Sequence, residues 1–138
     1  MQFKYLPTLY AQLALGLGDS AKAIKLLETA APYELSVPGQ AGFAPALSPI
    51  YVRGQTYLAA KNASRAAAEF RKILDHHGIV FNELIGALSH LGLARAYTFQ
   101  GDGAKARAAD DDFFALWKNA DFEVPILKQA KAEYAKLP

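Results

Sequence analysis

Three consecutive carboxylates and two adjacent histidines are the residues of this sequence that could do metal chemistry. Asp110, Asp111 and Asp112 offer hard oxygen ligands of the kind that bind Ca²⁺ or Mg²⁺. In a helix, however, consecutive side chains point about 100° apart and cannot converge on one ion. His76 and His77 diverge for the same reason, and no histidine four residues away completes a helical ligand pair. We therefore predict no metal site, and we expect the histidines to lie at the negatively polarised C-terminal end of a helix.

One segment resembles a cofactor-binding loop in its spacing alone. Gly16-Leu17-Gly18-Asp19-Ser20-Ala21 fits the loose form of the dinucleotide fingerprint. That loop needs a strand before it and a βαβ unit around it, whereas here the apolar residues on both sides recur at helical spacing. The segment is therefore predicted to join two helices, and no cofactor is expected.

Nucleophilic catalysis lacks its residues in this chain. The sequence has no cysteine, and nothing places one of its serines beside a histidine and a carboxylate. We therefore predict a noncatalytic protein with no catalytic residue.

Length and charge exclude further classes of function. The chain has 138 residues, which is enough for one core without metals or disulfides. Its net charge of +2 is small and the basic residues are spread, so no nucleic-acid binding is expected. No apolar run approaches the roughly 18 residues of a membrane span, so we expect a soluble segment that does not insert into a membrane. The sequence does not distinguish a cytoplasmic from a periplasmic location, which depends on the parent protein.

Apolar residues recur at helical spacing along nearly the whole chain, and alternation over strand lengths is missing. Gly18 suits a left-handed helix end, with Asp19 or Ser20 as the next N-cap. In a second turn, Asn62 is expected to take the left-handed conformation and Ser64 to cap the following helix. The pattern predicts an all-α fold of seven helices, at about 5–17, 20–31, 48–60, 64–76, 82–100, 104–117 and 125–137.

Residues 36–47, rich in Gly and Pro, are predicted to form a connector whose role is open.

One pattern of small and large side chains occurs three times. Gly54, Tyr57, Ala66, Phe70 and Ile73 define it. The same offsets hold Ala11, Ala14, Ala23, Leu27 and Ala30 in a unit that lies 43 residues earlier, and Ala94, Tyr97, Ala106, Asp110 and Phe113 in one that lies 40 residues later. Such units bury their apolar faces by stacking on their neighbours. The small residues are expected to let the two helices of a hairpin cross closely, and the aromatic residues to fill the gap between hairpins.

The register of Gly54-x-x-Tyr57 with Ala66-x-x-x-Phe70 resembles the tetratricopeptide repeat family. The resemblance implies a single domain, 1–138, built as an α-solenoid of stacked antiparallel helical hairpins. Three hairpins and a C-terminal capping helix are expected at about 4–37, 47–80, 87–120 and 124–137. The spacings exceed the usual family period of about 34 residues. Asp110 stands where the third repeat should carry an aromatic residue, so we expect an underpacked third interface.

Longer strings between Tyr51 and the end of the chain carry a second resemblance. Tyr51-Val-Arg-Gly and Leu93-Ala-Arg-Ala-Tyr97 are among those similar to the C-terminal repeat region of large bacterial serine/threonine protein kinases and related multidomain signalling proteins. The resemblance implies a fragment of a longer protein whose other parts hold a kinase or DNA-binding domain. The chain has no phosphate-binding glycine loop with a downstream lysine, and neither a His-Arg-Asp nor an Asp-Phe-Gly tripeptide. Kinase activity is therefore not expected of this chain.

The tetratricopeptide resemblance also implies where a protein or peptide partner would bind, on the concave surface made by the first helix of each hairpin. Seven side chains are expected there: Thr8, Gln12, Tyr51, Gln55, Leu91, Arg95 and Thr98. Tyr51 and the amides would hold an extended or helical segment, with Arg95 as the charged anchor. We predict a noncatalytic protein–protein interaction module of a bacterial signalling protein. The alternative is a structural spacer or self-association domain with no peptide ligand.

Two further expectations concern packing. Arg53 falls where the family pattern places a large apolar residue, so its guanidinium either reaches outward or pairs with an acid such as Glu69, and the pair is favoured. The first hairpin would expose apolar surface, which predicts a homodimer through Tyr5, Leu6, Leu9 and Tyr10.

Overall fold

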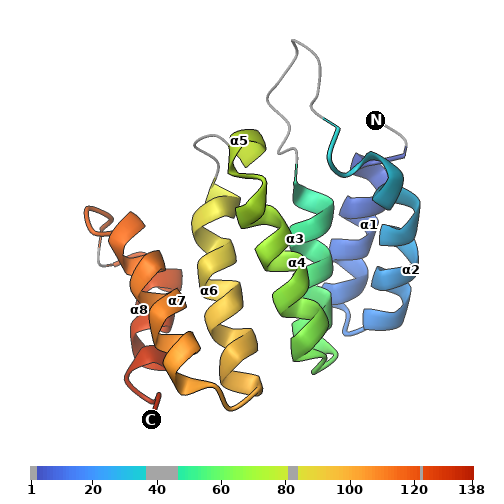
Figure 1. Cartoon of the computed structure of the whole chain (residues 1–138). Helices are drawn as coiled ribbons and strands as arrows, with labels where there is room; N and C mark the ends of the chain where they lie inside the picture. The colour runs from blue at the N-terminus through green and yellow to red at the C-terminus, as the bar shows by residue number, and fades with distance from the viewer. Residues whose placement is uncertain (1–2, 37–46, 81–83, 122) are drawn as a thin grey trace.

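The computed structural model describes residues 3–36, 47–80, 84–121 and 123–138, and these form helices and no strand. The helices are α1 (Tyr5–Gly16), α2 (Ser20–Ala30), α3 (Ser48–Ala59), α4 (Ala63–Asp75), α5 (His77–Val80), α6 (Leu84–Phe99), α7 (Gly103–Leu116) and α8 (Pro125–Tyr134), with a 3-10 turn η1 (Ala31–Tyr33) after α2 (Figure 1). The predicted all-α class is confirmed over this part of the chain. Each of the seven predicted helices has a counterpart, whereas the short α5 was not predicted. Residues 37–46 of the predicted connector lie outside the described residues.

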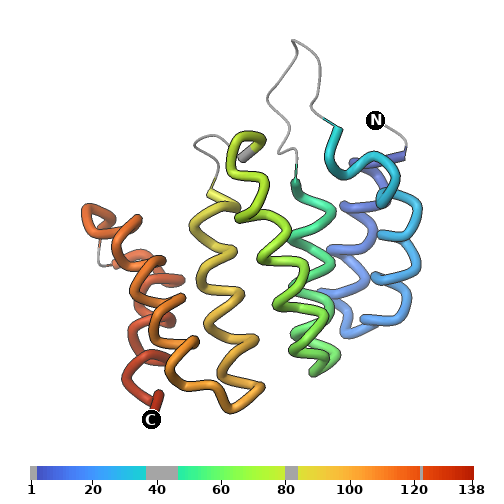
Figure 2. The backbone as a smooth tube through the Cα atoms, in the orientation of Figure 1, coloured from blue at the N-terminus to red at the C-terminus, as the bar shows by residue number. Residues whose placement is uncertain are grey.

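The helices pack as pairs that follow one another along the chain. α1 packs on α2, α3 on α4, and α6 on α7. Between pairs, α1 and α2 contact α3, while α3 and α4 contact α6, and α8 contacts α7. Figure 2 shows the resulting row, from the blue N-terminal pair to the red C-terminal helix. Among the residues that the structure describes, no helix has both the length and the apolar character needed to cross a lipid bilayer.

The turns within the three pairs share one hydrogen-bonded geometry. Gly18, Lys61 and Gly101 have positive φ values of 81°, 56° and 76°. The next residue in each turn, Asp19, Asn62 or Asp102, donates its backbone N–H to a carbonyl five residues earlier. The side chain of that same residue caps the following helix by accepting a backbone N–H three residues later. These contacts satisfy the free carbonyls of one helix and the free N–H groups of the next, so each turn is a Schellman motif followed by an N-cap.

The prediction for the second turn is wrong by one or two positions. Lys61, rather than Asn62, takes the left-handed conformation. Asn62, rather than Ser64, is the N-cap, and its Oδ1 accepts the N–H of Arg65 at 3.3 Å. The physical reason is that an Asn side chain reaches the free N–H groups at a helix start, where its oxygen satisfies a donor that would otherwise lack a partner.

Phe70 on α4 fills the space between the second and third pairs. Its ring is fully buried and lies against Gly54 on α3 and Gly92 on α6. A Cβ added at Gly54 would lie 2.8 Å from the ring, and one added at Gly92 would lie 2.6 Å from it. Both separations are too short for real carbon atoms, so the two glycines provide the room that the ring occupies. The prediction that an aromatic residue fills this gap is therefore confirmed. The space left by the missing side chain of Gly54 is occupied by the ring of Phe70.

Arg53 on α3 joins the first and second pairs through a buried ionic network. Its Nη2 lies 2.8 Å from Oε2 of Glu34 and 2.7 Å from Oε2 of Glu69. Lys72 on α4 also pairs with Glu34. Burial by itself lowers the pKa of Arg53, but hydrogen bonds and charges from Glu69 and Glu34 outweigh it and raise that pKa. The predicted pair with Glu69 is confirmed, and Glu34, just after η1, is a second partner that the sequence did not indicate.

Candidate functional site

The first helices of the three pairs line one hollow of about 480 Å³. α1, α3 and α6 supply most of its wall, and the end of α7 and the start of α8 close it on one side. The lining residues are Gln12, Leu15, Tyr51, Val52, Gln55, Leu84, Leu88, Arg95, Trp117 and Ile126. We call this hollow the first-helix groove. Its wall is mostly apolar and carries few polar groups, which is the composition of sites that bind an organic ligand or peptide side chains.

Tyr51 is a fixed polar group of the first-helix groove. Its ring packs edge-on against Phe70, with 5.9 Å between ring centroids. Its hydroxyl oxygen accepts a hydrogen bond from Nε2 of Gln55 at 2.9 Å. Burial raises the pKa of Tyr51, and the hydrogen bond from Gln55 and the charge of Arg95 offset this only in part. The phenol therefore stays protonated at neutral pH and keeps a proton that it can donate to a ligand.

Arg95 is held by α8 and is not a free anchor. Its Nε and Nη2 donate to the two carboxylate oxygens of Glu133 at 2.8 and 3.1 Å, in a bidentate pair. Gln129 also donates to Oε1 of Glu133, at 2.8 Å. Such a pair fixes the guanidinium plane and neutralises most of its charge toward a ligand. The expectation that Arg95 anchors a ligand stays a prediction, and its guanidinium already has a carboxylate partner on the last helix.

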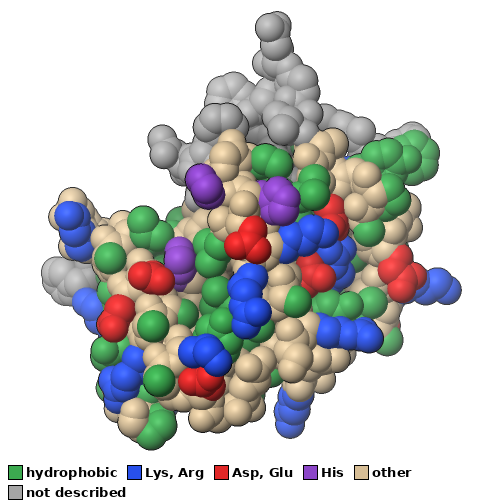
Figure 3. Space-filling model, viewed as in Figure 1, with side chains coloured by type: hydrophobic (Ala, Val, Ile, Leu, Met, Phe, Trp, Pro, Cys, Tyr) green, Lys and Arg blue, Asp and Glu red, His purple; other side chains and the backbone are tan. Residues whose placement is uncertain are grey.

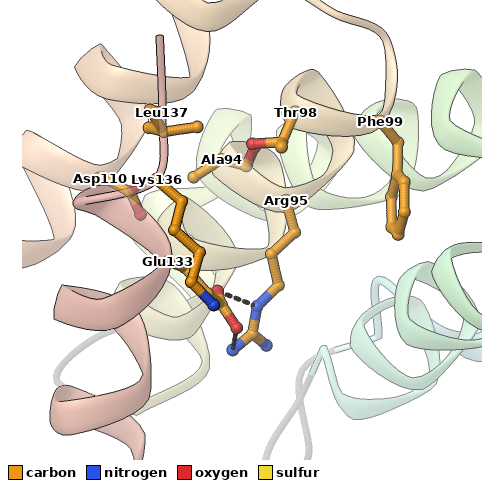
Figure 4. A pocket seen from close by; sticks show the side chains of 8 residues that line it. All are labelled: Ala94, Arg95, Thr98, Phe99, Asp110, Glu133, Lys136 and Leu137. Atoms are coloured by element: carbon orange, nitrogen blue, oxygen red, sulfur yellow. Dashed lines mark hydrogen bonds and ion pairs between the residues drawn. The ribbon is translucent and has the colours of Figure 1, made fainter.

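A second hollow, of about 280 Å³, lies on the other side of Arg95 between α6, α7 and α8. We call it the Asp110 pocket, and Figure 4 shows the side chains that line it. Asp110 is only 3% exposed, and no residue of the described chain donates a hydrogen bond to its buried Oδ1. Burial, together with the nearby charge of Glu133, raises the pKa of Asp110 to about 6, and Arg95 opposes this shift. The expected underpacking of this interface is thus observed, as a pocket beside an unpaired carboxyl group.

The remaining predicted groove residues lie elsewhere. Thr8 is buried and its hydroxyl donates to the carbonyl of Lys4 at 2.6 Å. Leu91 is 1% exposed and packs in the cluster around Phe113. Thr98 lines the Asp110 pocket, and its hydroxyl donates to the carbonyl of Ala94 at 2.8 Å. The structure therefore brings four of the seven together in the first-helix groove, namely Gln12, Tyr51, Gln55 and Arg95.

The three consecutive carboxylates have separate surroundings, as helical geometry predicts. Asp110 is buried, whereas Asp111 and Asp112 are exposed. Asp112 Oδ2 lies 3.6 Å from Nδ1 of His90 on α6. Burial lowers the pKa of His90, and Asp112 opposes that shift. Farther along the chain, Nδ1 of His76 lies 2.7 Å from the carbonyl oxygen of Lys72, at the C-terminal end of α4 where a histidine was expected.

No protein-family model, curated protein or solved structure that was compared with this chain matches it. The resemblance to tetratricopeptide repeats therefore stays a prediction.

Several groove residues could not be found from the repeat pattern. Trp117 follows the end of α7 and Ile126 lies on α8, and both line the first-helix groove. Neither belongs to the first helix of a hairpin, so neither lies on the concave surface that the resemblance implied. Leu15, Leu84 and Leu88 lie on first helices, and helical spacing alone assigns such leucines to the core. In the structure Leu84 is 58% exposed, so it is available to a partner.

Proposed function

We propose that this chain is a noncatalytic protein-interaction module that holds a peptide segment of a partner protein in the first-helix groove. One observation carries the proposal: residues from α1, α3 and α6, one helix of each pair, line a single hollow. A segment lying there would contact all three pairs at once. The apolar wall favours apolar side chains of the partner, and the Tyr51 hydroxyl and the Gln12 and Gln55 amides supply hydrogen bonds to its backbone.

The repeated turn geometry and the consecutive packing of pairs support a finer proposal about architecture. We propose a tetratricopeptide-like α-solenoid of three hairpins, α1 with α2, α3 with α4, and α6 with α7, followed by α8 as a capping helix. In such an array the first helices form one surface and the second helices another. The face shown in Figure 3 carries basic, acidic and apolar side chains interspersed over the described residues. That mixture is typical of a surface in contact with water, which leaves the first-helix groove as the better surface for a partner.

Affinity capture from a cell lysate, with this chain as bait and two matched double variants, tests the peptide-binding proposal. Gln12→Glu with Leu84→Glu puts two carboxylates at exposed positions of the first-helix groove. Gln100→Glu with Leu116→Glu makes the same chemical changes at exposed positions outside it. We expect at least one protein captured by the wild type and the control variant and lost with the groove variant, with all three proteins folded by circular dichroism. If the groove variant captures the same proteins as the wild type, the groove is not the binding surface.

A second candidate function, self-association, is favoured by the outer face of α1. Leucine and tyrosine side chains at spacings of three and four residues form one apolar stripe there, with Leu6 43%, Leu9 53%, Tyr10 54% and Leu13 57% exposed. We call this the α1 stripe. Contiguous apolar surface on a helix is a common site of protein contact. We therefore propose that two copies of the chain associate through it, which is compatible with peptide binding in the first-helix groove.

A further inference from the structure

The Asp110 pocket exists because the repeat pattern changes one side chain. Asp110 occupies in α7 the position that Phe70 occupies in α4, since Phe70 follows Gly54 by the same number of residues as Asp110 follows Ala94. The ring of Phe70 fills the space between its own pair and the next helix. A carboxyl group is much smaller than a phenyl ring, and a hollow of about 280 Å³ lies at the corresponding place beside α8. The volume that an aromatic side chain fills in one interface is thus open in the other.

One polar atom beside this pocket has no hydrogen-bond partner among the described residues. Arg95 directs its Nε and Nη2 donors to Glu133, and Glu133 as a carboxylate can only accept hydrogen bonds. In Figure 4 the Lys136 side chain extends toward that pair. Oδ1 of Asp110 is buried without a donor in the described chain, and leaving such a group unpaired is costly. Asp110 also lines the pocket, so a donor bound there would lie beside its carboxyl group.

The walls of the pocket limit what that group can be. Ala94, Phe99 and Leu137 give it an apolar lining next to the carboxyl group. A hard metal ion needs several oxygen ligands, whereas the only other carboxylate in the wall, Glu133, is already bound to Arg95. An alkyl chain that ends in a cationic nitrogen matches both features, because the chain contacts the apolar walls and the nitrogen donates to the carboxylate.

We propose that the Asp110 pocket binds an organic cation, an alkylammonium or guanidinium group whose N–H donates to the carboxylate of Asp110. The cation can belong to a free amine or to a Lys or Arg side chain of a bound protein. Arg95 lines both this pocket and the first-helix groove, so the two hollows adjoin at its side chain. The proposal stands apart from the proposed function, because a free amine would bind even if the groove holds no peptide.

Titration followed by ¹H–¹⁵N NMR spectroscopy of the whole chain tests the proposal. The probes are n-butylamine, Nα-acetyl-lysine N-methylamide and Nα-acetyl-arginine N-methylamide. The uncharged control is Nα-acetyl-norleucine N-methylamide, and acetate is the anionic control. We expect saturable shifts of the backbone signals of Ala94, Asp110 and Leu137 with the cations alone. Tighter binding of the capped amino acids than of n-butylamine would identify a protein side chain as the source, whereas tighter binding of n-butylamine would identify a free amine.

Two variants decide whether Asp110 is the group that binds. Asp110→Asn keeps the shape and removes the charge, so binding of the cations should weaken about tenfold or more, as expected for loss of a charged hydrogen bond. Lys136→Met removes a competing cation, so binding should stay equal or become tighter. The spectrum of each variant shows whether it is folded. Equal affinity of Asp110→Asn and wild type, weaker binding by Lys136→Met, saturation with acetate, or no saturation with any cation would each overturn the proposal.

Discussion

At the scale of single residues, Asp110 is the feature of this chain with the clearest physical consequence. Burial of a carboxyl group that is 3% exposed and has no donor on Oδ1 disfavours its ionised form relative to a carboxyl group in water. The pKa of Asp110 is raised from 3.8 to about 6, chiefly by burial and then by Glu133. Between those two values the folded chain binds more protons at this site than the unfolded chain does. The free energy of unfolding therefore falls as the pH rises from about 4 to about 6.

The variant Asp110→Asn measures this contribution. We expect its stability relative to the wild type to rise by roughly 2 kcal/mol between pH 4 and pH 7, because only the wild type has a carboxyl group that ionises at this buried position. Glu133, Arg95 and Asp111, whose charges act on Asp110, are present in both proteins, so the difference between them isolates one group. Urea denaturation at several pH values gives the comparison. A difference in stability that does not change with pH would show that this carboxyl group is not buried in its charged form.

The pairing of charged residues shows what the sequence can and cannot indicate at this scale. The pair of Arg53 with Glu69 was predictable because both lie within one hairpin, on helices joined by a short turn. The pair of Arg95 with Glu133 joins residues on α6 and α8, whose relative placement no local pattern sets. Asp110 was predictable as an exception to the repeat, because a polar residue stood at an aromatic position. The pocket beside Asp110 was not predictable, since its volume depends on how closely the neighbouring helices pack around the smaller side chain.

At the scale of elements, the three turns are the most regular part of the structure. Each uses a residue with positive φ followed by an Asx cap, and the first and third turns use glycine at the left-handed position. The second turn uses Lys61 at φ 56°. A residue with a Cβ in this conformation costs about 1 kcal/mol relative to glycine.

The variant Lys61→Gly should therefore stabilise the protein by about 1 kcal/mol, since the structure of the turn already fits glycine. Lys61 is exposed and no described residue pairs with its ammonium group, so no contact is lost. Thermal unfolding gives the measurement, and Gly101→Ala is the reciprocal control, expected to lower stability by a similar amount. A less stable Lys61→Gly variant would mean that the lysine makes an interaction in the folded chain that outweighs the strain of its backbone.

Helix content was predictable because apolar residues recur at helical spacing over many turns, and glycine, proline and Asx residues separate the helices. The ends were less accurate. In the second turn, two adjacent residues, Lys61 and Asn62, divide the left-handed and capping roles, and the sequence alone favours Asn for either one. The short α5 was missed because four residues are too few to show a period.

At the scale of the whole molecule, the interfaces between pairs differ in how they are closed. The first and second pairs are joined by the buried network of Arg53, Glu34, Glu69 and Lys72. The second and third are joined by the ring of Phe70 against two glycines. The contact of the third pair with α8 uses the Arg95–Glu133 pair and leaves the Asp110 pocket open. Both proposed ligand sites adjoin this last junction, so we infer that this is the part of the molecule that contacts ligands.

At the opposite end of the row, the α1 stripe tests whether the molecule associates with itself. Association through a twofold axis would bury Leu9 and Leu13 of both copies, and each buried leucine contributes about 1 to 2 kcal/mol. Leu9→Glu with Leu13→Glu should therefore raise the dimer dissociation constant at least about a hundredfold. Sedimentation velocity over a range of concentrations measures it, with Leu116→Glu, exposed on α7, as the control that should still dimerise. A wild-type protein that stays monomeric at every concentration would contradict self-association through this stripe, and the first-helix groove would then be the better candidate for contact with other proteins.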